Sequence, residues 1–347
     1  MKKIMNKKTL YSIKDISRIA GFSTATVSNA LNGTRYVKKE TKELIKKIAN
    51  ELNYYPNVSA RGLKAKTTNT IGIIIPDISN PFYSDVIKYC EVVAKENGYI
   101  IILACTYYDI KEEITTIEKF RKQLVDGIIS FSGYDEANFY IKKVYEESKI
   151  PVVIASDNEE IYSKVPSIIA DDKAAIEKGF SYLYDIGHRK IGFISYGSKI
   201  FKHVKNRYKG YVESLRHYKL EYIPEFVILS DDLFLNEIEV SYNLIRKNFK
   251  DKSSLPTAFL SGSDLIAIGI INALKDLKIK IPEEIAVIGF DDISISKYFN
   301  PRLTTLKQST KTLGFKAMEI LLDLIKGKKK KIKQIILPTE LVIRESA

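Results

Sequence analysis

Short, uncharged side chains gather on one face of a segment near the N-terminus. Residues 24–31 combine an apolar inner face with an outer face that carries Thr24, Ala25, Ser28 and Asn29. Hydroxyls and amides of this size hydrogen bond to base edges in the major groove, and a small methyl group contacts thymine. The alternative, a purely structural helical hairpin, more often carries Glu and Lys on its outer face. The pattern therefore favours a helix that reads DNA.

The residues around this face predict a helix-turn-helix. Ser12 followed by Asp15 forms a capping box that begins a first helix. Gly21 supplies a tight turn, Ser23 caps the second helix, and a third helix is expected over residues 40–52. The apolar side chains of the first helix recur at helical spacing and should share one buried face: Ile13, Ile16, Ile19 and Ala20.

The net charge of the chain is concentrated in its first 67 residues. They hold 15 Lys and Arg against 4 Asp and Glu, which is +11 of the chain's +13. A basic surface confined to a small domain is the electrostatic footprint of binding to the phosphate backbone. The alternative is an ordinary solvent-exposed basic surface that binds no nucleic acid. Such a surface would not place most of the net charge in a fifth of the chain. Charge and motif together indicate double-stranded DNA as a partner.

The rest of the composition argues against several classes of protein. The two cysteines, Cys90 and Cys105, have no metal-ligand spacing, and the three histidines are scattered. The sequence has no phosphate-binding loop, metalloprotease motif or nucleophile elbow, so we expect no enzyme, cofactor or metal. The longest apolar stretch, residues 265–274, is far shorter than the ~20 residues that a membrane span requires. With no secretory signal at the N-terminus, a cytoplasmic protein is expected.

Apolar runs of strand length follow residue 70 in two series. Runs within each series recur roughly every 25–35 residues, the length of a βαβ unit, and near-continuous apolar strands are typical of parallel sheets covered on both faces. The sequence predicts an all-α head followed by an α/β core of two doubly wound parallel-sheet subdomains, with a ligand crevice at the carboxyl ends of the strands. The runs are residues 71–76, 100–104, 127–131 and 151–155, then 191–195, 225–229, 257–260 and 285–290.

Motifs spread over the whole chain carry a family resemblance. They are STATVSNALNG (23–33), NYYPN (53–57), ARGL (60–63), TIGIIIPDISNPF (70–82), VDGII (125–129), GHR (187–189), IGFDD (288–292) and LTTLKQ (303–308). In this order and spacing they resemble the LacI/GalR family of transcriptional regulators. The resemblance implies a homodimer or tetramer on a pseudo-palindromic operator, and a core similar to periplasmic binding proteins of type I. We expect a homodimer, because no extended heptad repeat follows residue 344.

The expected domains are a DNA-binding head at residues 1–56, a hinge helix and linker at 57–69, and a core at 70–347. Subdomain 1 of the core is expected to span about 70–168 and 307–334, and subdomain 2 about 169–303 and 335–347. The chain would cross between them three times, near residues 167–170, 303–308 and 335–338. A ligand between the subdomains would favour one closure angle and so alter the spacing of the two DNA-binding heads.

The resemblance also implies a set of DNA-contacting residues. Segment 57–63 would become a hinge helix on DNA and insert Leu63 between base steps as a wedge, rather than leave it as an ordinary linker residue. Two residues depart from the family pattern: Asn29 stands where several members carry Arg, and Lys38 where the third helix usually has a capping Ser. The expected contacts are Thr24, Ala25, Thr26, Ser28, Asn29, Asn32, Tyr54, Asn57, Ala60, Arg61, Leu63 and Lys64.

Five residues are expected to contact a small polar effector, which the resemblance implies is carbohydrate-like. Arg207 and Asp291 match ligand-contacting positions of the family, and Asp264 follows an apolar strand. Phe82 and Tyr83 offer ring surfaces from subdomain 1. The polar residues also have structural alternatives: a helix cap for either aspartate, and a surface position for Arg207.

Three departures from the family pattern weaken the assignment of any particular sugar. Ser263 replaces the usual Asn, Asp171-Asp172 replaces an Asp-Asn pair, and Ser156 stands where a strand usually ends in a carboxylate. The sequence therefore predicts an effector-controlled repressor whose ligand is not identified. The alternative, a periplasmic-type solute-binding protein without a regulatory role, is disfavoured by the helix-turn-helix and the missing signal peptide.

We expect Leu63→Ala to reduce operator bending and to weaken specific DNA binding several-fold or more. The wedge acts only when the hinge is folded in the minor groove, so non-specific binding, which depends on phosphate contacts, should barely change. A circular-permutation gel assay measures the bend. An unchanged bend angle would rule out the wedge.

Overall fold

The computed structural model divides into two units, residues 1–68 and residues 69–347. It describes residues 11–33, 35–52, 54, 67–123, 125–131, 135–148, 150–155, 165–197, 202–234, 236–249, 254–328 and 334–347. The predicted hinge helix therefore lies outside the described residues. Within the described ranges, no helix is both long enough and apolar enough to cross a membrane.

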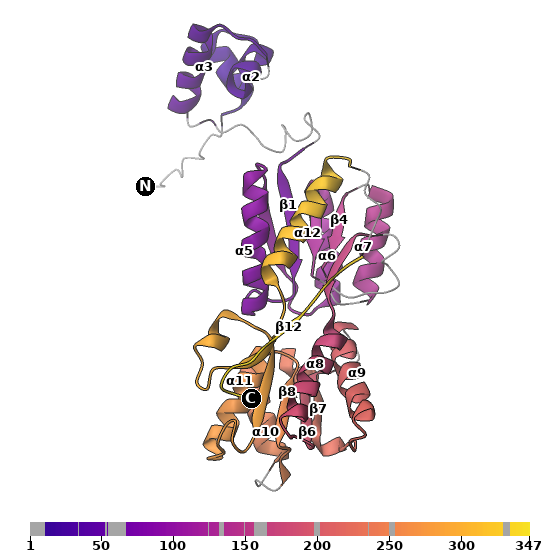
Figure 1. Cartoon of the computed structure of the whole chain (residues 1–347). Coiled ribbons are helices and arrows are strands. Elements are labelled where there is room, and N and C mark those ends of the chain that lie inside the picture. The colour runs from indigo at the N-terminus through magenta and orange to yellow at the C-terminus, as the bar shows by residue number, and fades with distance from the viewer. Residues whose placement is uncertain are drawn as a thin grey trace, which may run out of the picture. The chain divides into compact units, whose positions relative to one another are not determined.

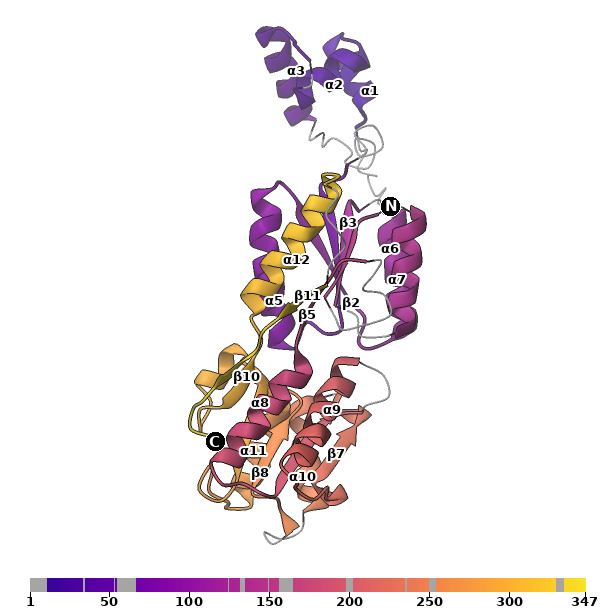
Figure 2. The ribbon, with the colours of Figure 1, turned by 45° about the vertical axis from the view of Figure 1, so that its right-hand side comes forward.

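Three short helices form the first unit: α1 (Ile13–Ala20), α2 (Thr24–Asn32) and α3 (Lys39–Glu51) (Figures 1 and 2). The predicted helix-turn-helix is present. Gly21 turns the chain with a φ of 71°, and Ser23 Oγ accepts a hydrogen bond from the backbone N–H of Thr26 at 3.1 Å. The Asp15 carboxylate accepts a hydrogen bond from the backbone N–H of Ser12, as a capping box requires, and a second one from the Ser12 hydroxyl. The buried core of the unit is Ile16, Val27, Ala30, Ile45 and Ala49.

One residue predicted to be in this core is exposed. Ile19 has 52% of its surface accessible, whereas Ile16 is fully buried. At 3.6 residues per turn, Ile19 lies about 60° around the helix from Ile16, on the side away from Ile13 and Ala20. The prediction for Ile19 was therefore wrong, because the residue stands at the margin of the apolar stripe.

Six parallel strands form the first sheet of the second unit. They are β1 (Thr70–Ile75), β2 (Ile100–Cys105), β3 (Gly127–Ser130), β4 (Val152–Ile154), β5 (Ser167–Ala170) and β11 (Gln334–Leu337). Their order is β11-β5-β4-β3-β1-β2. One face is covered by α5 (Pro81–Glu96) and α12 (Thr310–Ile325), and the other by α6 (Ile110–Lys122) and α7 (Asp135–Ser148) (Figure 2). We call this layer structure subdomain 1.

The second sheet also has six strands, one of them antiparallel. They are β6 (Ile191–Tyr196), β7 (Val227–Ser230), β8 (Ala258–Ser261), β9 (Ala286–Asp291), β10 (Thr304–Lys307) and β12 (Glu340–Val342), in the order β12-β10-β9-β8-β6-β7. Strand β12 pairs antiparallel to β10. Helices α8 (Asp172–Asp185) and α9 (Lys202–His217) cover one face, and α10 (Glu237–Asn248) and α11 (Asp264–Asp276) the other. Subdomain 2 also contains the short 3-10 helices η1 (Pro224–Phe226), η2 (Asp231–Phe234) and η4 (Ser294–Lys297).

The predicted class, a helical head and a core with two sheets, is confirmed, but the crossover segments differ in detail. The chain changes sheet after β5, β10 and β11. Strands β5 and β11 pair in parallel register, from Ser167 opposite Gln334 to Ala170 opposite Leu337. The predicted boundary at residues 334 and 335 therefore cuts through β11, and the last crossover follows Leu337. A strand of four residues is too short for its apolar pattern to be told from a linker.

Strand β2 departs from the prediction that the strands are covered on both faces. It is the last strand of its sheet, and Ile100, Ile102 and Leu103 have 64%, 38% and 36% of their surfaces exposed. Ile100 and Ile102 point to the same face, because successive residues alternate across a strand. An apolar strip on an edge strand invites association with another surface.

Candidate functional site

The outer face of α2 presents part of the predicted DNA-contacting set. Thr24 and Ala25 are exposed, and Ser28 and Asn29 are half-buried. Ser28 Oγ accepts a hydrogen bond at 3.2 Å from Asn32 Nδ2. This bond joins two of the predicted contacts along one side of the helix, so it orients the Asn32 amide before any base is present.

Other members of the predicted set are placed differently. Thr26 Oγ1 lies 2.9 Å from Ser23 Oγ, so its hydroxyl takes part in the helix cap. Tyr54 packs against the apolar core of the first unit, where burial raises the pKa of its phenol. Contacts to DNA from Thr26 and Tyr54 would therefore use atoms that also stabilise the fold. The remaining predicted contacts, Asn57, Ala60, Arg61, Leu63 and Lys64, lie outside the described residues.

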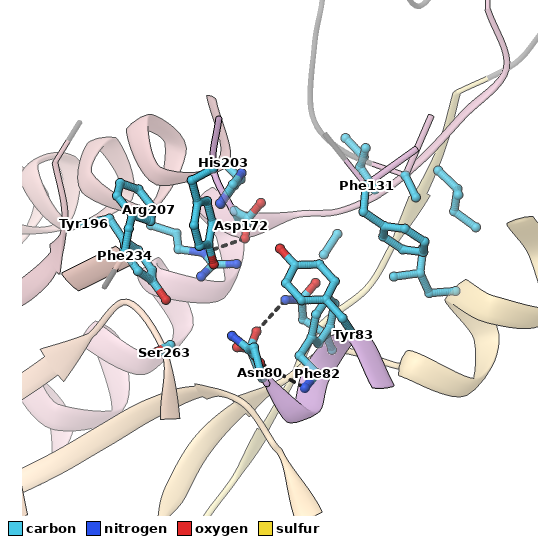
Figure 3. A pocket seen from close by; sticks show the side chains of 18 residues that line it. Asn80, Phe82, Tyr83, Phe131, Asp172, Tyr196, His203, Arg207, Phe234 and Ser263 are labelled. Atoms are coloured by element: carbon cyan, nitrogen blue, oxygen red, sulfur yellow. Dashed lines mark hydrogen bonds and ion pairs between the residues drawn. The ribbon is translucent and has the colours of Figure 1, made fainter. Parts of the chain in front are cut away.

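A polar cavity lies between the two subdomains of the core, at the carboxyl ends of their strands (Figure 3). It encloses about 80 Å³, room for several water molecules and therefore for part of a small ligand. Asn80, Phe82, Tyr83 and Phe131 enter it from subdomain 1, and Asp172, Tyr196, His203, Arg207, Phe234 and Ser263 from subdomain 2 (Figure 3). Asp291 and Gln308 also line it. This is the crevice that two doubly wound sheets predict.

Four of the five predicted effector contacts line this cavity. Phe82 and Tyr83 lie in the first turn of α5, which begins at Pro81 and is capped by Asn80 Oδ1 accepting from Phe82 N at 3.0 Å. Arg207 projects from α9, and Asp291 ends strand β9. The sequence therefore predicted residues that the fold brings together from distant parts of the chain.

Arg207 is held rigidly at the cavity wall. Its Nε donates to Asp172 Oδ1 at 2.8 Å, and its Nη1 donates to the backbone oxygen of Gly262 at 2.5 Å. The guanidinium carbon lies 3.7 Å from the centroid of the Phe290 ring. Both charged partners are buried, and burial raises the pKa of Asp172 although the Arg207 charge acts in the opposite direction. The surface position considered for Arg207 is thus excluded.

Asp291 is buried in a strained backbone position. Its φ is 113°, in a region that non-glycine residues rarely adopt. Asp291 Oδ1 accepts a hydrogen bond from Gln308 Nε2 at 2.7 Å, and burial raises the pKa of the carboxyl group well above its usual range. Strain at a buried carboxylate in a cavity is typical of a binding position, where the surrounding structure fixes the side chain in advance.

Asp264 is the exception among the predicted effector contacts. Its side chain is fully buried and does not line the cavity. Asp264 Oδ2 accepts from the backbone N–H of Ile293 at 2.8 Å and from Ser296 Oγ at 2.6 Å, while Oδ1 accepts from Thr305. Burial raises the pKa of Asp264 to about 7. The prediction is corrected: Asp264 ties the segment after β9 to β10, and the helix cap that begins α11 is supplied by Ser263.

Several residues of the cavity had not been predicted as ligand contacts. The Tyr108 and Phe234 rings lie 4.6 Å apart between centroids, and Phe234 stacks on Tyr196 at 4.7 Å. His203 stands one helical turn before Arg207, and burial lowers its pKa to about 3, so its ring is neutral at ordinary pH. Tyr196 ends strand β6 and Tyr108 lies three residues after the end of strand β2, so attention to strand ends could have found both. Phe234 and His203 gave no such signal.

We expect Asp264→Ala to lower the free energy of unfolding of the core by about 2–4 kcal/mol, because it leaves the buried donors of Ile293, Ser296 and Thr305 unpaired. Asp291→Asn should change stability by less than about 1 kcal/mol, because it removes a charge whose burial is unfavourable. Denaturant unfolding measures both. Equal losses in the two variants would contradict the division into a structural and a cavity aspartate.

Two family profiles match separate parts of the chain. Residues 12–57 match the profile of bacterial regulatory proteins of the lacI family, and residues 180–347 match a periplasmic binding protein-like domain. The chain is 32% identical to the HTH-type transcriptional repressor PurR of Pasteurella multocida, over 96% of this chain and 98% of the relative. It is also 32% identical to the ribose operon repressor of Haemophilus influenzae, with the same coverage.

A solved structure agrees in fold. The lac repressor dimer bound to operator and an anti-inducer superimposes with a TM-score of 0.80 at 22% identity, over 97% of this chain and 99% of that one. The curated relatives are transcriptional repressors, which confirms the prediction that the chain is not an enzyme. The resemblance that the motifs carry is likewise confirmed: this chain belongs to the lacI family of bacterial regulatory proteins.

Proposed function

We propose that the chain is a transcriptional repressor that binds a specific operator and is controlled by a small polar effector, sugar or sugar-like, in the cavity between the core subdomains. The observation that carries the proposal is the cavity itself. Its polar wall combines donors and acceptors on buried, preformed side chains, Arg207, Asp291 and Asn80, with aromatic faces around them. Ligand sites of this composition fix the orientation of a small polar molecule.

The control of DNA binding follows from where the cavity lies. Both subdomains contribute side chains to the cavity, so the affinity for a ligand would depend on the closure angle between them. A ligand can shift the equilibrium between two conformations only through its different affinities for them. Three crossovers connect the two sheets, and we propose that the subdomains close about that region. Transmission to DNA would use the segment 57–69 between the two units. We place this activity in the cytoplasm, where operator DNA is found.

Binding to a pseudo-palindrome requires two heads, and we propose a homodimer that buries the apolar strip on strand β2. Ile100 and Ile102 are exposed on one face of this edge strand, and Val92 of the neighbouring α5 has 37% of its surface exposed. An isologous interface places the same strip of both copies in contact. Symmetry of the protein would then match the symmetry of the operator.

The solute-binding alternative has a specific weakness. A protein that only carries solutes has no use for a helix-turn-helix whose outer face is uncharged and exposed, and the first unit has such a face at Thr24 and Ala25. The match of residues 12–57 to regulatory proteins supports the same choice.

The purified full-length chain should bind a pseudo-palindromic site near its own promoter, with an affinity that falls steeply as salt rises. Thr24→Ala and Ala25→Thr should shift the preferred base at one half-site position by about 1–3 kcal/mol, because these side chains lie on the face expected to meet base edges. Binding-site selection from a randomised half-site measures the preference.

The matched control is Lys14→Ala, which removes an exposed charge from α1 and should change affinity equally for all sequences. If the Thr24 and Ala25 variants weaken all sequences equally as well, neither residue reads bases.

Replacing the strip on β2 tests the dimer. The double variant Ile100→Glu and Ile102→Glu should convert the dimer to a monomer and weaken operator binding at least tenfold, because burying four carboxylates at a symmetric interface is strongly unfavourable. Ile336→Glu, on the opposite edge strand β11, is the control, since that isoleucine is 55% exposed and lies outside the proposed interface. Sedimentation velocity reports the mass, and a dimer that survives the β2 variant but not the β11 variant would contradict the assignment.

A further inference from the structure

Carboxyl groups outnumber permanently cationic side chains among the described residues that line the cavity. Arg207 is the one lining side chain among them that carries a permanent positive charge, whereas Asp172 and Asp291 are both lining carboxylates. His203 does not add a second cation, because burial, and then the Arg207 charge, hold its pKa far below neutrality. The local balance therefore disfavours an anionic ligand.

The positive charge of Arg207 is already engaged. The Asp172 carboxylate lies 2.8 Å from its Nε, and a second donor of the guanidinium is taken by the Gly262 carbonyl. A phosphate at the remaining N–H donors of the guanidinium would share a charge that Asp172 already partly neutralises. Displacing Asp172 outright would leave a buried carboxylate without its partner, which is strongly unfavourable.

A third carboxylate stands directly behind the cavity wall. Glu237, the first residue of α10, has its Oε1 3.2 Å from Asn80 Nδ2, and its Oε2 accepts a hydrogen bond from Ser263 Oγ. Its carboxylate also takes the hydroxyl of Tyr196. All three partners line the cavity, and Asn80 belongs to subdomain 1 whereas the others belong to subdomain 2. Glu237 thus joins the two subdomains through residues that a ligand would touch.

The charge of Glu237 is felt inside the cavity. It contributes to raising the pKa of the Tyr83 phenol, after burial and the charge of Asp291. It also contributes to raising the pKa of the Asp291 carboxyl group, after burial and the charge of Asp264. Its own pKa is raised by burial, although the hydrogen bonds from Ser263 and Tyr196 act in the opposite direction. A further negative group placed beside Tyr83 and Asp291 would meet this same field.

We propose that Glu237 makes the cavity selective for an uncharged, hydroxyl-rich effector and excludes the phosphorylated form of the same molecule. This inference rests on the proposed function and specifies its ligand. A phosphate monoester carries between one and two negative charges at neutral pH, and like charges a few ångströms apart in a partly desolvated site repel strongly. Hydroxyl groups, in contrast, carry no charge and can donate to the lining carboxylate of Asp291, of which Gln308 occupies one oxygen.

A purely structural role for Glu237 is the competing explanation, because an acidic side chain in the first turn stabilises a helix. The two roles make different predictions. A helix-stabilising carboxylate affects the thermal midpoint alone, whereas a selectivity residue changes the ratio of affinities for a charged and an uncharged ligand.

The test uses matched pairs of probes on the full-length chain: ribose with ribose 5-phosphate, glucose with glucose 6-phosphate, and adenosine with its 5′-monophosphate. Thermal unfolding finds which probes bind, since a ligand raises the midpoint, and calorimetry measures the affinities. We expect an unphosphorylated probe to bind and its phosphorylated partner to bind at least tenfold more weakly. Glu237→Gln, which keeps the shape and the hydrogen-bonding atoms, should reduce that ratio at least fivefold.

Glu239→Gln is the matched control. Glu239 lies two residues along the same helix, is exposed, and accepts a hydrogen bond from Asn236 Nδ2, so the same charge change there should leave the ratio unaltered. A phosphorylated probe that binds wild type as well as or better than its partner overturns the proposal, as does an equal effect of both variants. So does a panel in which no unphosphorylated probe binds.

The wild-type ratio decides the charge selectivity even if Glu237→Gln does not fold. Operator binding, measured on the same wild-type preparation, distinguishes a failure of the proposed repressor function from a failure of the proposed charge selectivity. Loss of operator binding with a preserved affinity ratio would overturn the proposed function and not the selectivity of the cavity, and the reverse result would overturn only the selectivity.

Discussion

The ion pair between Arg207 and Asp172 is the interaction on which the core site depends. It joins the middle of α9 to the first residue of α8, the helix that begins immediately after a crossover from subdomain 1. The same guanidinium contacts the Gly262 carbonyl after β8 and the Phe290 ring in β9. One side chain thereby fixes the ends of three elements of subdomain 2. Removing either charged partner would leave the other buried and uncompensated, at a cost of about 3–5 kcal/mol.

This arrangement explains why the cavity can respond to a ligand without being built by it. The wall in subdomain 2 is held by the ion pair and by Asp264, which fastens the segment after β9 through three hydrogen bonds. Among the described residues, contacts that join the subdomains at the cavity include the hydrogen bond from Asn80 to Glu237 and the contact between the Tyr108 and Phe234 rings. A rigid wall with a small number of closing contacts is what a two-state closure requires, because a ligand of modest affinity can then tip the balance.

Local patterns in the sequence predicted most of the fold, and strand ends together with the family resemblance pointed to four residues that line the cavity. The capping box at Ser12 and the cap at Ser23 depend on neighbours three residues away. Continuous apolar runs predict the buried strands. Three features that the sequence did not predict share one cause. The exposure of Ile100, the structural role of Asp264 and the position of Glu237 behind the cavity are set by which strands lie at an edge and which loops meet across it. No spacing along the chain encodes those relations.

Charged side chains act differently in the first 67 residues and in the cavity of the core, because solvent screens them to different extents. Positive side chains in the first 67 residues act through water, so each contributes a weak, salt-screened attraction and many are needed. In the cavity a few buried charged groups act at short range in a medium that screens them poorly, so under our proposal the position of a single carboxylate would affect which ligands bind. DNA affinity could then be changed by adding or removing basic residues without disturbing the cavity. Selectivity for the proposed effector would instead depend on the few groups that contact Arg207, Asp291 and Glu237.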